Sequence, residues 1–441
     1  MIKKEKNRKF NLKIESKDID SRALFIINRL NDLDYEALVV GGCIRNLVMR
    51  QEANDWDIAT KATAEKIIEA FRDYKVVPVG RKFGTVTVVI NHVNYQVSTF
   101  KRSKSTGVPN LFEDLRHRDL TINALAWIEG EGIIDCFNGL TDLKQKMIRG
   151  VEDPTERIKE DPLRMLRAVR LACELDFKID KSTLLAIEKN SNLIKKVSPE
   201  RIRDELIKIL LSNFPKRGLK LLHQSGMLKF ILPELESGVG FYTEGGYEGK
   251  DLFSYILDMV DHLIPDLALR LSILLYDIEK SQAFYSKREI ADRILHRLRF
   301  KNSLIKKVNI LIREDGQKAD FSSKKNIRQI ISRIGKENTL SILELKKADA
   351  VVSKGVGKLK QIEKIEKELR EILKEKPPLS LKDLAINGRD LIGLGYNEGK
   401  GIGIRLQKLL KMVIDKPELN KREILLRFLK LEDSNFLGRK K

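Results

Sequence analysis

The chain has few cysteines, few aromatic residues and no long apolar segment. Its three cysteines, Cys43, Cys136 and Cys173, lie far apart and form no ligand pair. This distribution fits a reducing cytoplasm and argues against disulfides and structural zinc. No apolar run approaches membrane-spanning length, so we expect no membrane partner. Aromatic residues make up 6% of the chain, which disfavours recognition of single strands by base stacking.

Positive charge is present in clear excess. The chain carries 84 basic and 63 acidic residues, for a formal net charge of +21. Such an excess favours a polyanionic partner, most simply RNA or DNA, held through its phosphates and its shape. A chain of 441 residues is also too long for one ordinary core, and we expect two to four domains.

Strand patterns occupy the first third of the chain and helical patterns the rest. Runs rich in Val, Ile and Thr predict strands at 37–41, 55–60, 75–79, 84–91 and 94–100, with helices at 22–33 and 64–72 between them. From about Glu156 onward, helical spacing continues almost without interruption. These patterns predict an α+β head followed by a helical region.

The most informative segment runs from Leu38 to Asp57. An apolar strand leads to Gly41-Gly42, a turn whose backbone can approach a phosphate closely, and Arg45 follows. Asp55 and Asp57 lie on a predicted strand, where alternate side chains share one face. Two carboxylates beside a glycine turn form a site for divalent metal and phosphoryl transfer. The Gly-Gly-x-x-Arg spacing favours this interpretation over a solvated acidic strand edge.

Three later segments carry further candidates. Arg118, Asp119 and Asn123 precede a run of small residues. The segment from Glu160 to Arg170 is predicted as one helix, and it carries Asp161, Arg164, Arg167 and Arg170 at a spacing of three residues. A third segment, Ser198-Pro-Glu-Arg-Ile202, predicts the start of another helix.

In this order, from about residue 22 to residue 430, the motifs resemble the class II tRNA nucleotidyltransferases. That family is the CCA-adding branch of the polymerase-β-like superfamily, which also contains bacterial poly(A) polymerases. The tail segment from Leu384 to Ile392 fits the same pattern. The resemblance implies a nucleotidyltransferase head with a mixed sheet at 20–148, a base-recognising helical neck at 149–215, a helical body at 216–335 and a tRNA-binding tail at 336–441.

The resemblance also implies an activity and site residues. The protein would add CMP and AMP, from CTP and ATP, to the 3′ end of tRNA without a template. Asp55 and Asp57 would be catalytic and would hold two Mg²⁺ ions. The nucleotide would be bound by these residues: Gly41, Gly42, Arg45, Arg118, Asp119, Asn123, Asp161, Arg164, Arg167 and Arg170. For Arg118 and Asp119 a buried salt bridge between sheet and neck is the alternative.

Asp161 and Arg164 match the edges of two bases. Cytosine and adenine each present an exocyclic amino group beside an unprotonated ring nitrogen, which an Asp acceptor and an Arg donor complement. Uracil and guanine present a carbonyl and a ring N–H, which oppose both contacts. The pair is therefore expected to select C and A, unless it is only an intrahelical ion pair.

Departures from the family pattern keep three alternatives open. Asn46 and Gln96 stand where the family has Asp and Glu, which favours a catalytically weak RNA-binding paralogue. The loop from Lys101 to Phe112 is short and contains Gly107-Val-Pro109, which favours an enzyme that adds only CC. Poly(A) polymerase is the third alternative. In the body, Tyr276 precedes Asp277 where relatives with an HD phosphohydrolase signature have His, so we expect a structural helix there. The sequence leaves the oligomeric state open.

Overall fold

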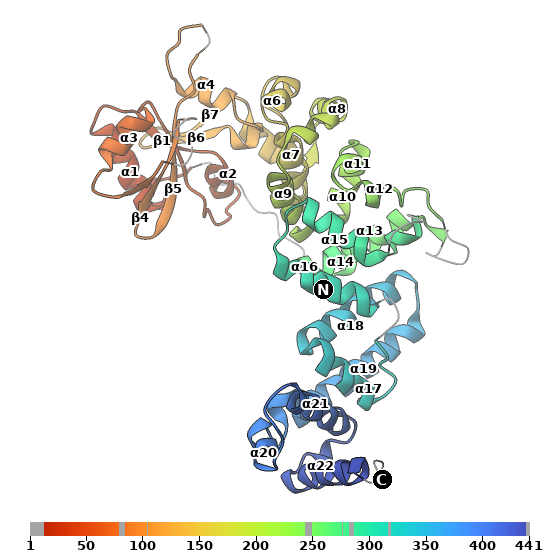
Figure 1. Ribbon diagram of the computed structural model, residues 1–441. Coiled ribbons are helices and arrows are strands. Elements are labelled where there is room, and N and C mark those ends of the chain that lie inside the picture. The colour runs from red at the N-terminus through yellow and green to blue at the C-terminus, as the bar shows by residue number, and fades with distance from the viewer. Residues whose placement is uncertain are drawn as a thin grey trace. The chain divides into compact units, whose positions relative to one another are not determined.

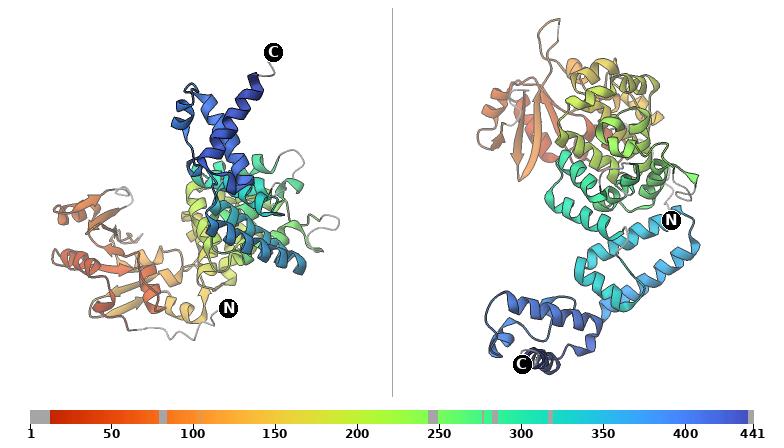
Figure 2. Two further views of the ribbon diagram at one scale, coloured as in Figure 1. Left: turned by 90° about the horizontal axis from the view of Figure 1, so that it is seen from below. Right: turned by 45° about the vertical axis from the view of Figure 1, so that its right-hand side comes forward.

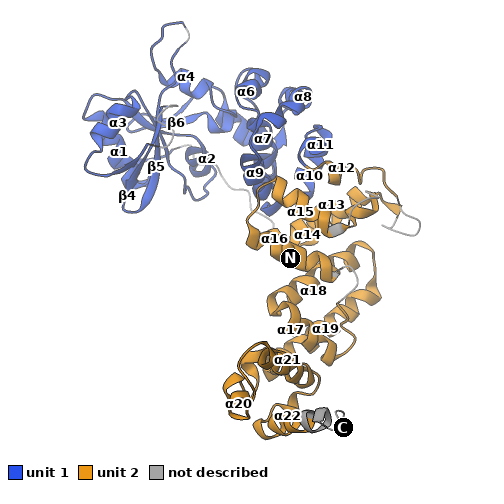
Figure 3. Ribbon diagram, in the orientation of Figure 1, with its two compact units in different colours: residues 1–231 blue, residues 232–441 orange. Residues whose placement is uncertain are grey.

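The computed structural model describes residues 13–78, 84–103, 105–242, 249–275, 277–281, 286–315 and 319–437. The chain forms two compact units, Met1–Ile231 and Leu232–Lys441, which Figure 3 colours separately. The strands, coloured red to orange in Figure 2, lie almost entirely in the first third of the chain. Within the described ranges, no helix is both long enough and apolar enough to span a bilayer.

The head contains a seven-stranded mixed sheet (Figure 1). Its strand order is β3-β4-β5-β2-β1-β6-β7, and only β2 and β5 pair in parallel. The strands are β1 Ala37–Val40, β2 Asp57–Thr60, β3 Lys75–Val77, β4 Thr85–Ile90, β5 Val93–Thr99, β6 Leu125–Ile128 and β7 Gly132–Asp135. The predicted mixed sheet is confirmed. The sequence did not predict β6 and β7, since these strands are short and lie beside small residues and glycines.

Helices cover the sheet of the head. They are α1 Ser21–Asn31, α2 Gly42–Val48, α3 Ala64–Ala70, α4 Leu111–Arg116 and α5 Gly139–Gln145. Helices α1 and α3 contact each other and neighbouring strands. Leu38 and Val40 alternate onto one face of β1, where they pack with Ala59, Phe100 and Leu115 in a buried core. This rigid core holds the end of β1, where the Gly41-Gly42 turn begins.

Six α-helices and a small sheet follow the head within the first unit. The helices α6 Pro154–Glu160, α7 Leu163–Glu174, α8 Lys181–Asn190 and α9 Pro199–Leu211, called the neck helices below, are followed by α10 Pro215–Gln224. A four-residue helix, α11 Leu228–Ile231, ends the unit. Strands β8 Met147–Ile148 and β9 Lys178–Ile179 pair in parallel beside these helices. The helical region therefore contains a short sheet that the sequence pattern did not predict.

The predicted strand 55–60 is two residues too long. Strand β2 begins at Asp57, which is the register partner of Val40 at the end of β1. The chain then turns away from the sheet at Gly41, whose φ is +90°. Because β1 provides no partner beyond Val40, Asp55 and Trp56 precede the strand instead of belonging to it.

The prediction of one helix from Glu160 to Arg170 is wrong. Helix α6 ends at Glu160, Asp161 has extended backbone (φ −147°, ψ 102°), and α7 starts at Leu163. Pro162 causes the break, because its ring excludes the helical conformation at the preceding residue. Asp161 and Arg164 therefore do not share one helix face, and their geometry depends on the turn between α6 and α7.

The second unit is helical in its described residues. Its helices are α12 Pro233–Glu236, α13 Leu252–His262, α14 Leu267–Leu274, α15 Lys287–Arg297, α16 Asn302–Asp315, α17 Lys324–Ile334, α18 Lys336–Val352, α19 Val356–Glu375, α20 Gly388–Gly393, α21 Lys400–Asp415 and α22 Arg422–Leu437. Leu391, Leu409, Val413 and Leu425 form a core at its C-terminal end. Tyr276, predicted to replace a metal ligand in a structural helix, lies outside the described residues.

Gly218→Ala tests how tightly α10 packs on the neck helices. A Cβ at Gly218 would collide with Ile209 Cγ2 of α9 and lie 3.0 Å from Cys173 Sγ of α7. Overpacking typically costs about 1–3 kcal/mol, and the gain in helix propensity returns only about 1 kcal/mol. We therefore expect a lower melting temperature, measured by the fluorescence of Trp56 and Trp127, both in the first unit. Gly357→Ala in α19 meets no atom within 4 Å and serves as the control. An unchanged melting temperature in Gly218→Ala would contradict the packing.

Candidate functional site

A cavity of about 730 Å³ opens in the first unit where the head meets the neck helices. Strands β2 and β5, with the turn after β1 and helix α2, provide one wall, and α7 and α9 provide another. All twelve site residues predicted from the sequence line this cavity: Gly41, Gly42, Arg45, Asp55, Asp57, Arg118, Asp119, Asn123, Asp161, Arg164, Arg167 and Arg170. The fold thus brings together residues that are up to 129 positions apart (41 to 170) in the sequence.

The Gly41-Gly42 turn lines the cavity beside the carboxylates of Asp55 and Asp57. Gly41 donates its N–H to the carbonyl of Leu125 at 3.0 Å. A Cβ at Gly41 would lie 3.1 Å from Arg118 Nη1 and 3.5 Å from Asp57 Oδ2. Both the positive φ and this close approach require glycine, and they leave backbone exposed to a ligand in the cavity.

Asp55 and Asp57 lie at the same end of the sheet. Asp57 is the first residue of β2 and pairs in register with Gln96 of β5, so the side chains of Asp57 and Gln96 project from one face of the sheet. Burial raises the pKa of Asp57 above its ordinary value; Arg118 opposes this shift, and the nearby charge of Asp55 adds to it.

The oxygens of this carboxylate pair suit a hard cation such as Mg²⁺, which would offset the unfavourable burial and mutual repulsion of the two charges. Within the described ranges, no group of three or more His, Cys, Asp or Glu residues could hold a metal ion. Gln96, at the third position of this face, contributes an amide oxygen without charge. The donor set therefore fits a divalent ion through two carboxylates.

Arg45 is a half-buried cation held by two amides. Its Nη1 donates to Asn123 Oδ1 at 2.5 Å, and its Nη2 and Nε donate to Asn46 Oδ1 at 2.9 and 3.1 Å. Burial, together with the charge of Arg170, lowers the pKa of Arg45 to about 10. Arg45 therefore remains charged at neutral pH, and an anionic ligand would compensate the free-energy cost of removing this charge from water.

Arg118 and Asp119 make separate ion pairs. Arg118 Nη2 donates to Asp114 Oδ2 at 3.0 Å, whereas Asp119 Oδ2 accepts a hydrogen bond from Arg167 Nε at 2.5 Å. Burial alone would raise the pKa of Asp119, but Arg167, with help from Asn123, lowers it to about 2. The Asp119–Arg167 pair links the chain after α4 to α7, so the salt bridge considered as an alternative is present. It lies on the cavity wall, where Asp119 can still contact a ligand.

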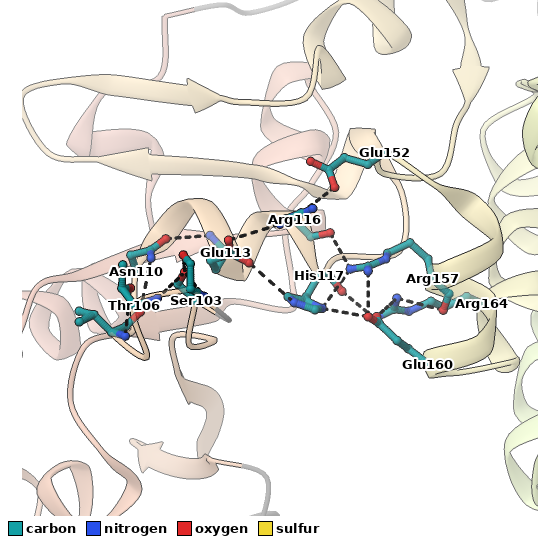
Figure 4. A network of polar contacts seen from close by, with 12 residues as sticks. Ser103, Thr106, Asn110, Glu113, Arg116, His117, Glu152, Arg157, Glu160 and Arg164 are labelled. Atoms are coloured by element: carbon teal, nitrogen blue, oxygen red, sulfur yellow. Dashed lines mark hydrogen bonds and ion pairs between the residues drawn. The ribbon is translucent and has the colours of Figure 1, made fainter.

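Asp161 and Arg164 stand on the neck side of the cavity. Arg164 donates from Nη2 to the carbonyl of His117 at 2.6 Å and from Nη1 to the carbonyl of Arg157 and to Glu160 Oε2 at 3.1 and 3.0 Å. Figure 4 shows this network around His117, with Arg157, Glu160 and Arg164 converging from the neck helices. Asp161 and Arg164 do not share one helix face, but they place a hydrogen-bond acceptor and a donor at the same wall of the cavity.

Some lining residues were not predicted as site residues. His117 precedes the Arg118-Asp119 pair, and its Nδ1 lies 3.0 Å from Arg157 Nη1 and 3.1 Å from Glu160 Oε1. Lys208 reaches the cavity from α9.

The chain matches known families along most of its length. The Poly A polymerase head domain matches residues 37–149, the RNA and SrmB-binding site of polymerase A matches residues 176–238, and domain 2 of tRNA nucleotidyltransferases matches residues 281–429. The head is therefore that of a nucleotidyltransferase.

Full-length relatives define the family more closely. The CCA-adding enzyme of Ligilactobacillus salivarius is 33% identical over 417 residues, which cover 92% of this chain and 95% of the relative. The CCA-adding enzyme of Enterococcus faecalis is 31% identical over 420 residues, covering 93% and 95%. The protein belongs to the family of CCA-adding enzymes, as the sequence motifs predicted, and it is a nucleotidyltransferase.

Solved structures agree with this assignment. The Bacillus stearothermophilus CCA-adding enzyme in complex with CTP aligns with a TM-score of 0.71 and 28% identity, over 94% of this chain and 98% of that one. The Thermotoga maritima CCA-adding enzyme, complexed with tRNA, shares the fold with a TM-score of 0.64 and 24% identity, over 94% and 96% of the chains.

The Asp119–Arg167 pair predicts a specific pH dependence. A carboxyl whose pKa falls from an ordinary 3.8 to about 2 on folding stabilises the protein fully above about pH 4, and this stabilisation disappears as the pH falls through about 2. The Asp119→Asn variant lacks this contribution. We therefore expect the difference in unfolding free energy between wild type and variant to shrink by about 2 kcal/mol from pH 5 to pH 2.

Denaturant titrations followed by the fluorescence of Trp56 and Trp127 measure this difference at each pH. Asp73→Asn, at an exposed aspartate outside the cavity, is the matched control and should follow wild type over the whole range. If the difference in unfolding free energy between wild type and Asp119→Asn stayed constant from pH 5 to pH 2, the stabilising role of the Asp119–Arg167 pair would be contradicted.

Proposed function

We propose that this protein adds CMP and AMP, from CTP and ATP, to the 3′ end of tRNA without a nucleic-acid template. One observation carries the proposal: a single cavity holds a carboxylate pair on its sheet wall and a base-complementary Asp–Arg pair on its helical wall. The relatives' names and a relative bound to CTP support the same conclusion.

Each group on the walls has a role in this reaction. Asp55 and Asp57 would hold two Mg²⁺ ions, which supply activation of the RNA 3′-hydroxyl and charge stabilisation at the leaving pyrophosphate. Arg45, Arg118 and Arg170 bind the triphosphate beside the Gly41-Gly42 backbone.

The remaining groups read the nucleoside. Asp119 and Asn123 accept and donate hydrogen bonds at the ribose, with Arg167 fixing the Asp119 carboxylate. Asp161 accepts from the exocyclic amino group of C or A, and Arg164 donates to the adjacent ring nitrogen. Since uracil and guanine present the opposite pattern, the protein itself supplies the base choice.

We also propose that the chain divides into a catalytic head at 20–148, a neck at 149–215, a body at 216–335 and a tail at 336–441. The net charge of +21 supports tRNA binding by the helical part, mainly through phosphates.

Addition of CC alone is the second candidate. The loop after β5 is short and folds on itself: Ser103 donates its N–H to the carbonyl of Val108 at 3.0 Å, and Arg102 and Pro109 form a bridge. Poly(A) synthesis and catalytically silent RNA binding are the remaining alternatives.

The products distinguish these candidates. Purified protein is incubated with Mg²⁺ and a tRNA that lacks its last three nucleotides, with each NTP alone and with all four together, and the products are sequenced. We expect CCA from the full mixture and CC from CTP alone. Products that end at CC in the full mixture would establish the CC-only candidate. Long A tails would establish a poly(A) polymerase, and a complete lack of incorporation would establish a catalytically silent RNA-binding protein.

Asp57→Ala tests the carboxylate pair. Removing one of two carboxylates on this face eliminates a metal-binding charge, and we expect incorporation to fall by about 1,000-fold or more. Binding of tRNA, measured by filter retention, should persist, and Asp73→Ala should retain wild-type activity. Turnover within tenfold of wild type in Asp57→Ala would refute the catalytic assignment.

A further inference from the structure

We propose that Lys208, on α9, binds the terminal phosphate of the incoming nucleoside triphosphate. Lys208 lines the same cavity as the carboxylate pair. The inference rests on the proposed use of CTP and ATP as substrates. It deepens that proposal, because it assigns the distinction between a nucleoside triphosphate and a diphosphate to one side chain.

Carboxylates already pair with most of the arginines that line the cavity. Each lining arginine other than Arg45 forms at least one ion pair. The pairs are Arg118–Asp114, Arg164–Glu160, Arg167–Asp119, and Arg170 with both Glu174 and Glu205. A carboxylate at this distance offsets much of the attraction that a guanidinium exerts on a further anion.

Arg45 and Lys208 are the exceptions among these lining cations. The partners of Arg45, Asn46 and Asn123, are neutral amides. The side chain of Lys208 is exposed and forms no hydrogen bond or ion pair with any residue that the structure describes. No protein carboxylate therefore pairs with either cation, and both retain their charge for an anionic substrate.

The face of α9 that meets α7 also carries Lys208. Helices α7 and α9 pack side by side (Figure 1). On α9, Glu205 follows Arg201 by four residues and Lys208 follows Glu205 by three, so the three side chains share one helix face. Arg201 contacts Asp161, just before α7, and Glu205 Oε2 lies 2.7 Å from Arg170 Nε. Lys208 thus lies about one turn beyond the level of Arg170.

That level is at the phosphate end of the cavity. Along α7, Arg164 belongs to the proposed base site, and Arg167 and Arg170 follow in steps of three residues, or about 4.5 Å each. Burial, and next the charge of Arg170, lower the pKa of Arg45 to about 10, so these two cations influence each other. Arg45 in turn lies beside the glycine turn, since a Cβ at Gly42 would be 3.4 Å from its Nη2. A lysine one turn further is therefore placed for the last phosphate.

The chemistry of the lysine fits this position. An ammonium group is a compact charge with three donors, and it binds a phosphate as a point charge without needing a fixed plane. A terminal phosphate carries about two negative charges near neutral pH. A nucleoside diphosphate ends one phosphate nearer to the ribose, so its last phosphate would lie short of Lys208.

The test measures the dissociation constants of CTP, CDP and CMP by isothermal titration calorimetry, with Mg²⁺ and without tRNA, so that no transfer takes place. The variants are Lys208→Ala, Lys208→Arg and Lys208→Glu. Lys220→Ala is the matched control, because Lys220 is an exposed lysine on α10, lies outside the cavity and has no ion pair among the described residues. Melting temperatures and tRNA binding by filter retention are measured for each variant.

We expect Lys208→Ala to weaken CTP binding by about tenfold, the usual effect of losing a hydrogen bond between charged groups. Binding of CDP, CMP and tRNA should stay within about twofold of wild type. Lys208→Arg should retain most of the CTP affinity, and Lys208→Glu should lose more than Lys208→Ala, because like charges repel. Lys220→Ala should bind all three nucleotides as wild type does.

Several outcomes would overturn the inference. Unchanged CTP binding in Lys208→Ala would exclude the contact, and equal losses of CTP and CDP would exclude the terminal phosphate as its target. Weaker tRNA binding with unchanged CTP binding would assign Lys208 to the RNA backbone instead. If Lys208→Ala does not fold, the ratio of CTP to CDP affinity in Lys208→Gln decides.

The proposed function is decided separately. Wild-type protein that binds CTP but incorporates no nucleotide into tRNA would refute the proposed reaction, whereas a loss specific to CTP in Lys208→Ala would still support the terminal-phosphate contact. Incorporation by wild type together with unchanged CTP binding in Lys208→Ala would support the reaction and overturn the role of Lys208 alone. Wild-type protein that does not bind CTP would refute both.

Discussion

The ion pair between the buried Asp119 and the half-exposed Arg167 joins the two parts of the site. Asp119 follows the head helix α4, and Arg167 lies on α7, on the neck side of the cavity. Without Arg167, Asp119 would lose the ion pair that offsets its burial, and an unpaired buried charge is expensive. The pair holds α7 against the head, and α7 carries Arg164 and Arg170 into the cavity that contains Asp55 and Asp57. In the proposed reaction, catalysis and base choice would therefore share one electrostatic contact between the head and α7.

Several arginine side chains line the cavity, and together they favour the binding of an anion. Arg45 is half-buried, its pKa is lowered to about 10, and its partners Asn46 and Asn123 are neutral amides. A triphosphate would supply the charge that these amides do not. Gln96 is likewise a neutral amide, and it lines the cavity beside Asp55 and Asp57 without adding a third carboxylate. Both departures from the family pattern reduce negative charge around a polyanionic substrate.

The proposed base selection requires a donor and an acceptor at a fixed separation, and the structure holds Asp161 and Arg164 at one wall of the cavity without placing them on one helix face. Pro162 breaks the helix between Asp161 and Arg164, so each side chain is supported separately. Arg164 is held by backbone carbonyls near His117 and by Glu160, while Asp161 is held by Arg201 of α9. In the proposed reaction, support of both groups by different elements would give the neck helices a direct part in specificity.

The sequence by itself determined the class of fold, the family and twelve of the residues that line the cavity. Alternation, the Gly41-Gly42 turn and the carboxylate spacing are local patterns, and local patterns survive without three-dimensional context. Only the tertiary structure decided where β2 begins, that Asp161 leaves the helix, and which partners hold Asp119 and Asp161. Strand length depends on the strand that pairs with it, and an ion pair such as Asp161–Arg201 joins residues 40 positions apart. No spacing rule in the sequence encodes such contacts, because packing between elements creates them.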